Sequence, residues 1–110
     1  MSDFGCLLVF KKKSGSLSQT DKELIINELA QEINEGSYSF MIEEGDYKTI
    51  YEWENNSFCV RLTEYYSDED EEEIWEFAEE EDLTDAKEIA TKLQVKFENT
   101  IDFSAIFTDW

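Results

Sequence analysis

The stretch FGCLLVF, residues 4–10, decides the fold that we predict for this chain. It is almost continuously apolar and rich in residues that favour β-strands. A strand with one face in water alternates apolar and polar side chains, whereas a strand buried on both faces does not. We therefore expect residues 4–10 to form a central strand of a β-sheet.

A helix is predicted after the short Gly/Ser linker that follows this strand. Thr20 and Glu23 have the Thr-x-x-Glu spacing of a capping box, which satisfies free backbone N–H groups at a helix start. Gly36 is expected to end the helix in the left-handed conformation. The helix should run from about Asp21 to Glu35. Its apolar stripe at helical spacing comprises Leu24, Ile25, Leu29, Ala30 and Ile33.

Residues 37–66 alternate apolar and polar side chains, which is typical of β-strands that are half buried. A three-stranded antiparallel meander is predicted, with strands at 37–44, 47–54 and 57–66. Asn55 and Asn56 fit a two-residue hairpin turn, because Asn tolerates the positive φ that such turns need. This turn would pair Trp53 with Phe58, Tyr51 with Val60 and Thr49 with Leu62.

An acidic run, DEDEEEIWEFAEEED, occupies Asp68 to Asp82, and eleven of its fifteen residues are Asp or Glu. Its apolar centre, residues 74–78, fits either a strand or a helix. We favour the strand, because aromatic residues suit a sheet and the carboxylates at 79–82 would oppose the dipole of a helix ending there.

A second helix is predicted from Asp82 or Thr84, either of which can cap it. Val95 and Phe97 then form a short strand or close the helix. A final strand or packed tail follows over residues 101–107. The helix would bury a stripe made of Ala86, Ile89, Ala90 and Leu93.

The order of these elements predicts the fold class. Strands and two amphipathic helices in this order suit an α+β two-layer sandwich, with a mostly antiparallel sheet and both helices on one face. A ferredoxin-like relative is compatible, because the β-α-β-β-α-β order is contained in the prediction. A length of 110 residues predicts a single domain over 1–110.

The net charge of −19 limits the classes of partner that the protein can bind. Nucleic acids are effectively excluded as partners, because their binding requires Lys and Arg residues and only nine are present, and anionic membranes are disfavoured for the same reason. The sequence contains no signal-peptide pattern and no apolar membrane span, so a cytoplasmic location is predicted. Cys6 and Cys59 lie in apolar runs and are expected to be buried free thiols.

Catalysis is not predicted. The chain has no His, which is the commonest general base and metal ligand, and its glycines form no phosphate-binding pattern. Residues 68–73 lack the spacing and the central Gly of a calcium loop. We therefore predict no cofactor and no shaped metal site.

The sequence favours a noncatalytic protein-binding module whose acidic surface docks on a basic protein. Small size and strong negative charge are typical of bacterial immunity proteins, and a nuclease or toxin with an electropositive site is the kind of partner they inhibit. The alternative is a small regulatory domain that binds a small ligand or divalent cation, or self-associates. The predicted docking residues are Tyr65, Tyr66, Asp68, Glu69, Asp70, Glu71, Glu72, Glu73, Trp75 and Glu76.

Overall fold

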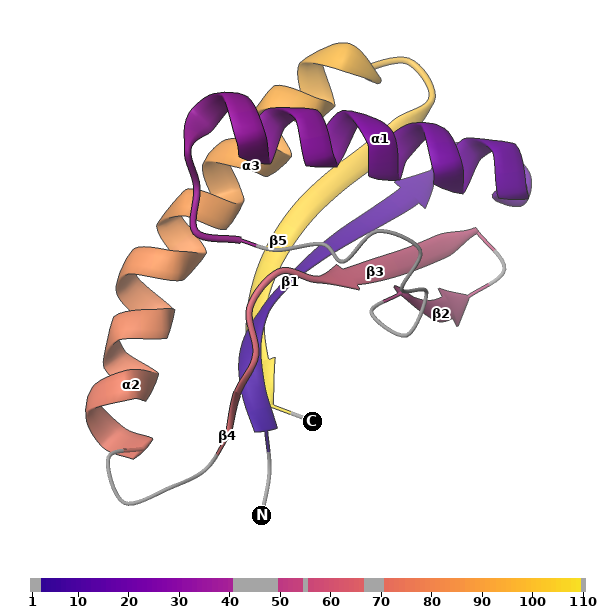
Figure 1. Ribbon diagram of the computed structural model, residues 1–110. Coiled ribbons are helices and arrows are strands. Elements are labelled where there is room, and N and C mark those ends of the chain that lie inside the picture. The colour runs from indigo at the N-terminus through magenta and orange to yellow at the C-terminus, as the bar shows by residue number, and fades with distance from the viewer. Residues whose placement is uncertain (1–2, 41–49, 55, 67–70, 110) are drawn as a thin grey trace.

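The computed structural model describes residues 3–40, 50–54, 56–66 and 71–109, with the backbone alone for residues 3, 50–54, 66, 71 and 72. Along the chain lie β1 (Asp3–Lys12), α1 (Gln19–Gly36), β2 (Ile50–Glu54), β3 (Ser57–Arg61), β4 (Tyr65–Tyr66), α2 (Glu71–Phe77), η2 (Ala78–Asp82), α3 (Leu83–Lys96) and β5 (Ile101–Asp109). The η2 segment is a turn of π-helix. It joins α2 to α3 without a break, and Figure 1 shows one long helical rod.

The strand β1 lies in the centre of the sheet, as its apolar sequence predicts. It pairs antiparallel with β3 and β4 along one side and with β5 along the other. The side chains of Phe4, Cys6, Leu8 and Phe10 are fully buried on one face, and Leu7 on the other face is only 6% exposed. The strand order across the sheet is therefore β5-β1-β3-β2, with β4 continuing beside β1 beyond the end of β3.

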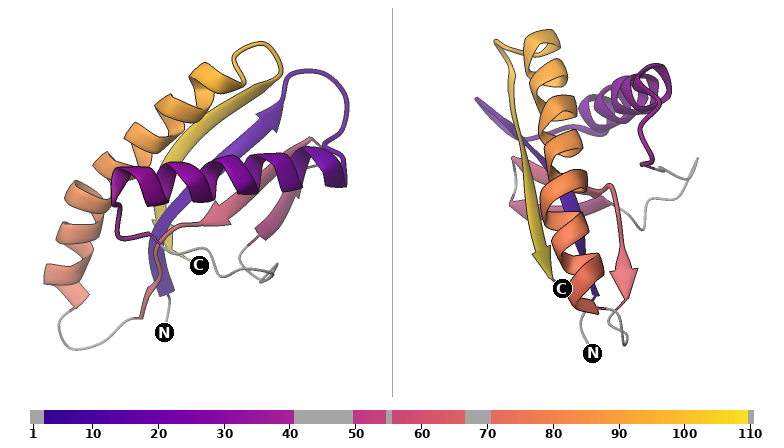
Figure 2. Two further views of the ribbon diagram at one scale, coloured as in Figure 1. Left: turned by 45° about the horizontal axis from the view of Figure 1, so that its top comes forward. Right: turned by 90° about the vertical axis from the view of Figure 1, so that its left-hand side faces the viewer.

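The helix α1 and the rod formed by α2, η2 and α3 cover the same face of this sheet (Figures 1 and 2). Ile25 and Leu29 of α1 and Leu93 of α3 are fully buried in one core with the sheet residues Phe10 and Val60. The predicted α+β two-layer sandwich is confirmed. The β2–β3 hairpin places β3 directly beside β1, which is the split β-α-β arrangement of ferredoxin-like folds. None of the described helices is long and apolar enough to cross a membrane.

The start of α1 corrects the predicted capping box. The N-cap is Ser18, whose Oγ accepts from the Asp21 N–H at 3.1 Å while the Asp21 carboxylate accepts from the Ser18 N–H at 3.1 Å. The Thr20 and Glu23 pair was placed two residues too late. Lys12 at the end of β1 explains the choice, because its Nζ lies 2.9 Å from Asp21 Oδ2 and lowers the pKa of that carboxyl.

The end of α1 corrects the prediction for the following segment. Ser37, not Gly36, adopts the left-handed conformation, with φ 56°. A side chain at Gly36 would collide with the Tyr38 ring, since an added Cβ would lie 2.3 Å from it. The Tyr38 hydroxyl donates to Glu88 of α3, so the described residues 37–40 pack on the helices and form no strand. The remainder of the predicted strand, at 41–44, lies outside the described residues.

The β2–β3 hairpin exists, but its predicted register is wrong by one residue. Glu54 pairs with Ser57 next to the turn as predicted, and the ladder then shifts between Glu52 and Glu54. Beyond this β-bulge, Glu52 faces Phe58, Tyr51 faces Cys59 and Ile50 faces Val60. A bulge adds one residue to one strand and so moves every later pair, which a turn-based register cannot anticipate. Thr49 lies outside the described residues.

The predicted strand over 57–66 is interrupted between β3 and β4. Here the backbone of Thr63 approaches β1 so closely that a Cβ at Gly5 would lie 2.1 Å from the Thr63 carbonyl oxygen. The Cys6 N–H donates to Thr63 Oγ1 at 3.0 Å across the same gap. The interruption shifts the pairing by one residue, so that Tyr65 lies opposite Phe4.

Candidate partner-binding surface

The described part of the acidic run, residues 71–82, forms a helix, so the strand favoured for residues 74–78 was wrong and the helical alternative is correct. Carboxylates at residues 79–82 would oppose the dipole only of a helix that ended at Asp82. The rod instead continues to Lys96. Most of its acids therefore occupy the N-terminal half, while Lys87, Lys92 and Lys96 occupy the C-terminal half together with Asp85 and Glu88. This is the distribution that the helix dipole favours. Consequently neither Asp82 nor Thr84 caps a new helix.

One side of α2 and η2 faces away from the sheet and carries what we term the acidic face: Glu73, Glu76, Glu79, Glu80 and Glu81. All five of these residues are exposed. Within the described residues, none of them forms an ion pair with Lys or Arg. Their negative charge therefore remains available to a partner.

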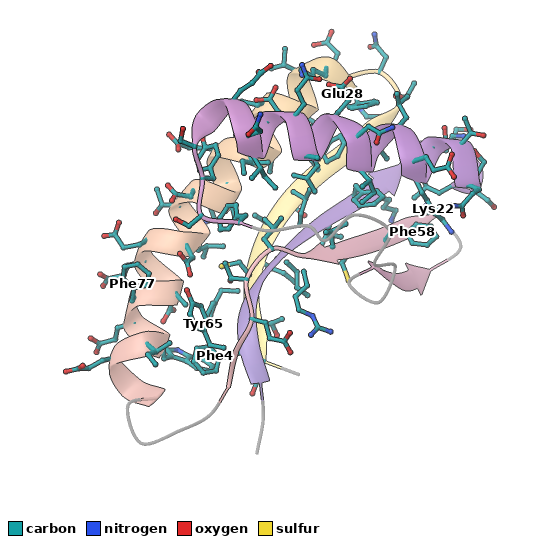
Figure 3. All side chains as sticks on the ribbon, viewed as in Figure 1. Phe4, Lys22, Glu28, Phe58, Tyr65 and Phe77 are labelled. Carbon is teal, nitrogen blue, oxygen red and sulfur yellow. The ribbon has the colours of Figure 1, made fainter. Side chains whose placement is uncertain are left out.

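An aromatic side chain lies within the acidic face. Phe77 is 55% exposed, which is unusual for so large an apolar residue, and Figure 3 shows it pointing away from the sheet. At helical spacing its neighbours are Glu73 one turn before it and Glu80 and Glu81 one turn after it. An apolar anchor surrounded by charge is a common composition of a protein-binding hot spot.

Trp75, which the sequence suggested as an exposed docking residue, lies on the inner side of the rod. Its ring centroid is 4.8 Å from that of Phe4 and 4.7 Å from that of Phe107. Trp75 is half-buried and ties α2 to β1 and β5. Of the two aromatics of α2, Phe77 is therefore the one available to a partner. The signal that distinguishes them is helical periodicity, because Trp75 shares its side of the rod with the buried Ala78 and Asp82.

Tyr65 also points inward rather than to a free surface. Its hydroxyl donates to Asp82 Oδ2 at 2.5 Å, which links β4 to the π-helical turn. Asp82 is only 6% exposed, and burial raises the pKa of its carboxyl although the Tyr65 hydrogen bond favours the ionised form. Burial and the neighbouring Asp82 raise the pKa of Tyr65. This contact holds the acidic half of the rod against the sheet.

The remaining predicted docking residues divide into three groups. Glu73 and Glu76 are exposed and lie on the acidic face. For Glu71, Glu72 and Tyr66 the structure gives the backbone, in α2 and β4. Asp68, Glu69 and Asp70 lie outside the described residues.

Elsewhere in the described structure, most cations are used internally. Lys96 of α3 lies 2.8 Å from both Glu28 and Glu32 of α1, and these contacts raise the pKa of Lys96. Lys22 lies over the Phe58 ring, 3.6 Å from its centroid. These lysines therefore interact with side chains of neighbouring elements of the fold. The acidic face takes no part in these contacts.

The cysteines are free and buried, as predicted. Burial raises the pKa of Cys6 to about 11, with a further contribution from the nearby charge of Asp82, and burial also raises the pKa of Cys59. Both are therefore protonated near neutral pH, and thiols in this form react poorly. Among the described residues, no group of three or more Cys, Asp and Glu side chains is placed to hold a metal ion.

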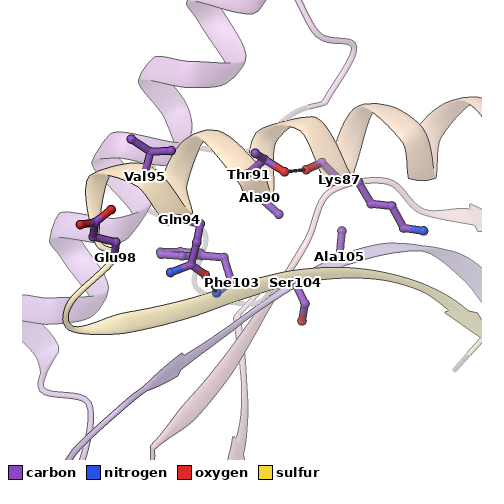
Figure 4. A pocket seen from close by; sticks show the side chains of 9 residues that line it. All are labelled: Lys87, Ala90, Thr91, Gln94, Val95, Glu98, Phe103, Ser104 and Ala105. Carbon is purple, nitrogen blue, oxygen red and sulfur yellow. Dashed lines mark hydrogen bonds between the residues drawn. The ribbon is translucent and has the colours of Figure 1, made fainter.

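A groove of about 490 Å³ lies between α3 and β5 (Figure 4). At one end, the Gln94 amide bonds to the β5 backbone: Nε2 donates to the Ile101 carbonyl and Oε1 accepts from the Phe103 N–H, both at 2.8 Å. No sequence motif indicates this groove. It is lined by Lys87, Ala90, Thr91, Gln94, Val95, Glu98, Phe103, Ser104 and Ala105.

Comparison of the chain with protein-family models, with curated proteins and with solved structures finds no match.

Proposed function

We propose that this protein is a noncatalytic binding module whose acidic face docks on an electropositive protein, as an immunity-type inhibitor docks on a toxin or nuclease. The observation that carries the proposal is Phe77, a largely exposed aromatic ring among five exposed carboxylates on the outer side of the rod. Phe77 supplies an apolar anchor, and the carboxylates supply charge that accelerates association with a basic surface.

The acidic face is held on the fold by contacts between the rod and the sheet, which favours a role in binding over that of a solvated acidic segment. Trp75 packs on Phe4 and Phe107, and Asp82 accepts from Tyr65, so the acidic half of the rod is held at two points. A surface held in place loses less conformational entropy on binding than a mobile acidic tail does.

Alanine variants of the two aromatic residues of α2 distinguish a residue that packs in the fold from one that is free to bind a partner. We expect Trp75→Ala to lower the free energy of unfolding by about 2–4 kcal/mol, because Trp75 contacts two rings of the sheet. Phe77→Ala should change it by less than about 0.5 kcal/mol, because Phe77 is largely exposed. Urea denaturation of both variants measures the difference. Equal losses would place Phe77 in the core and remove the proposed anchor.

The proposal itself is tested by capturing partners from a lysate of the source cells and measuring their kinetics. A basic protein should be recovered by the wild type. Phe77→Ala should increase its dissociation rate, and Glu76→Gln with Glu80→Gln should slow its association at low salt. The deficit in association should shrink as salt rises, because salt screens the lost attraction.

A matched control removes the same number of charges elsewhere. Glu23→Gln with Glu35→Gln changes two exposed carboxylates of α1, away from the acidic face. We expect this variant to bind nearly as well as the wild type. If it slows association as much as the Glu76 and Glu80 variant, the net charge alone matters and the acidic face is not the docking site. Recovery of no basic protein would also contradict the proposal.

A further inference from the structure

The strand β5 has one edge that no strand covers in the described part of the chain. It pairs with β1 in an unbroken register from Ile101 to Asp109, and β1 is its sole partner there. Edge strands are commonly protected by Lys, Pro or a β-bulge. The sequence IDFSAIFTD contains neither Lys nor Pro, and the β1–β5 ladder contains no bulge.

The hydrogen-bond pattern shows which backbone groups lie on this edge. Lys13 donates to the Thr100 carbonyl at 2.9 Å, just before β5 begins. In an antiparallel ladder the bonded residues alternate, so the even-numbered residues of β5 bond to β1. The outward groups belong to Ile101, Phe103, Ala105, Phe107 and Asp109. The Gln94 contacts with Ile101 and Phe103 agree with this assignment.

Gln94 already occupies the first position of the edge as a peptide group would. Its amide accepts from one N–H and donates to one C=O of β5, which is the pattern of a paired strand. Beyond it, the outward groups of Ala105 and Phe107 and the N–H of Asp109 continue the same ladder without a bond from the described residues, while the Asp109 carbonyl accepts from the neighbouring Thr108 Oγ1 at 3.3 Å. The groove beside them has the small side chains of Ala90 and Thr91 on its helical wall. An extended backbone fits such a position, between an edge strand and a helix.

We propose that the β5 edge beyond Gln94 takes an extended peptide segment carrying Lys or Arg as an added strand. This inference deepens the proposed function and rests on it, because it assigns the binding mode of the electropositive partner. The charge of the site favours a basic segment: Glu98 and Asp109 are exposed beside the edge, and Asp102 is exposed there with its carboxylate 3.5 Å from Lys13, whereas Lys87 is the one cation among the groove residues. A second copy of the chain would bring another 19 negative charges to the same edge.

The test uses a fluorescein-labelled peptide of four Lys-Val repeats and measures its Kd by anisotropy. Ala105→Pro removes the outward N–H, and proline is tolerated on an edge strand where that N–H faces away from its partner. Ala105→Val is the matched control, because it adds the same number of side-chain carbons and keeps the N–H. We expect Ala105→Pro to raise the Kd roughly three- to tenfold and Ala105→Val to change it less than about twofold.

A second measurement on the wild type does not depend on any variant's folding. The peptide should slow amide hydrogen exchange at Ala105, Phe107 and Asp109, as followed by NMR. A peptide of four Lys-Pro repeats has the same charge and lacks half of the backbone donors, and it should give no such protection.

Three results would overturn the inference: equal Kd values for the two Ala105 variants, equal protection by the two peptides, or protection of these amides without peptide that grows with protein concentration. The last result would identify a second copy as the occupant. This test does not involve Phe77 or the acidic face, so its failure leaves the docking proposal standing. Conversely, strand addition with unchanged partner kinetics for the Phe77 variant would reject the docking proposal alone.

Discussion

The two halves of the helical rod differ in how their charge is used. In α3, Ile89 and Leu93 are fully buried, and Lys96 is paired with Glu28 and Glu32 of α1. In α2 and η2, the acidic face forms no ion pair within the described residues, and Phe77 is largely exposed. Secondary structure is the same in both halves apart from one π-turn. The difference shows that a single helix can be core at one end and an available surface at the other.

The largest effect is expected in the buried half. Leu93→Ala should lower the free energy of unfolding by about 2–5 kcal/mol, because the side chain is fully buried and its removal leaves a cavity. Val95→Ala is the control on the same helix and should cost less than about 0.5 kcal/mol, because Val95 is 70% exposed. Thermal and urea unfolding measure both variants. Similar losses would mean that α3 does not present one buried side to the sheet.

A smaller effect is expected where the acidic half is tied down. Tyr65→Phe should cost about 1.5–3 kcal/mol at pH 7, because it removes the donor from the buried carboxylate of Asp82. Burial already raises the pKa of Asp82, so this group contributes less stability as the pH rises above the ordinary aspartate value of about 3.9. Without the Tyr65 hydrogen bond, this pKa rises further. The cost of Tyr65→Phe should therefore shrink as the pH falls and Asp82 takes up its proton.

Asp82→Asn is the control for this contact. The Asn carbonyl keeps an acceptor for the Tyr65 hydroxyl and does not ionise, so the variant should lose the pH dependence that Asp82 contributes. Urea denaturation between pH 4 and pH 7 measures all three proteins. A cost of Tyr65→Phe that does not vary with pH would show that the contact matters through packing and not through the charge of Asp82.

The smallest effect is expected on the acidic face itself. Glu76→Gln with Glu80→Gln should leave the melting temperature unchanged or slightly higher at low salt, with a change of less than about 0.5 kcal/mol in stability, because repulsion falls and no buried contact is lost. The gain should vanish near 0.15 M salt, where screening is strong. Lys96→Gln should have the opposite sign, because it breaks the pairs with Glu28 and Glu32. A lower melting temperature for the Glu76 and Glu80 variant would mean that the acidic face has internal partners.

The elements that local sequence specifies were predictable. Residues 4–10 indicated a central strand because they are apolar on both faces, and β1 pairs on both sides. Helical spacing and a capping residue placed α1 to within about two residues of its observed start. The final alternating segment forms β5, and Phe97 closes α3 and forms no strand. The layer arrangement followed from the order of these elements.

The features that depend on distant contacts were not predictable in the same way. A β-bulge between Glu52 and Glu54 moved the hairpin register, and the turn residues carry no information about it. The strand predicted in the acidic run assumed a helix end at Asp82, whereas the rod continues through a π-turn. The inward position of Trp75 and the outward position of Phe77 depend on which side of that rod meets the sheet. Two of the predicted docking residues, Glu73 and Glu76, are therefore exposed beside Phe77, which the predicted set omitted.

The open edge of β5 also bears on how the protein stays dispersed. A nine-residue edge without Lys, Pro or a bulge is a template on which other chains can stack into growing aggregates. At neutral pH the charge of −19 keeps such edges apart by colloidal repulsion. Acidification towards the carboxyl pKa values, near 4, removes that repulsion while the backbone groups of the edge are unchanged. The excess of carboxylates therefore opposes edge-to-edge association of the protein's own sheet, in addition to any role in binding a partner.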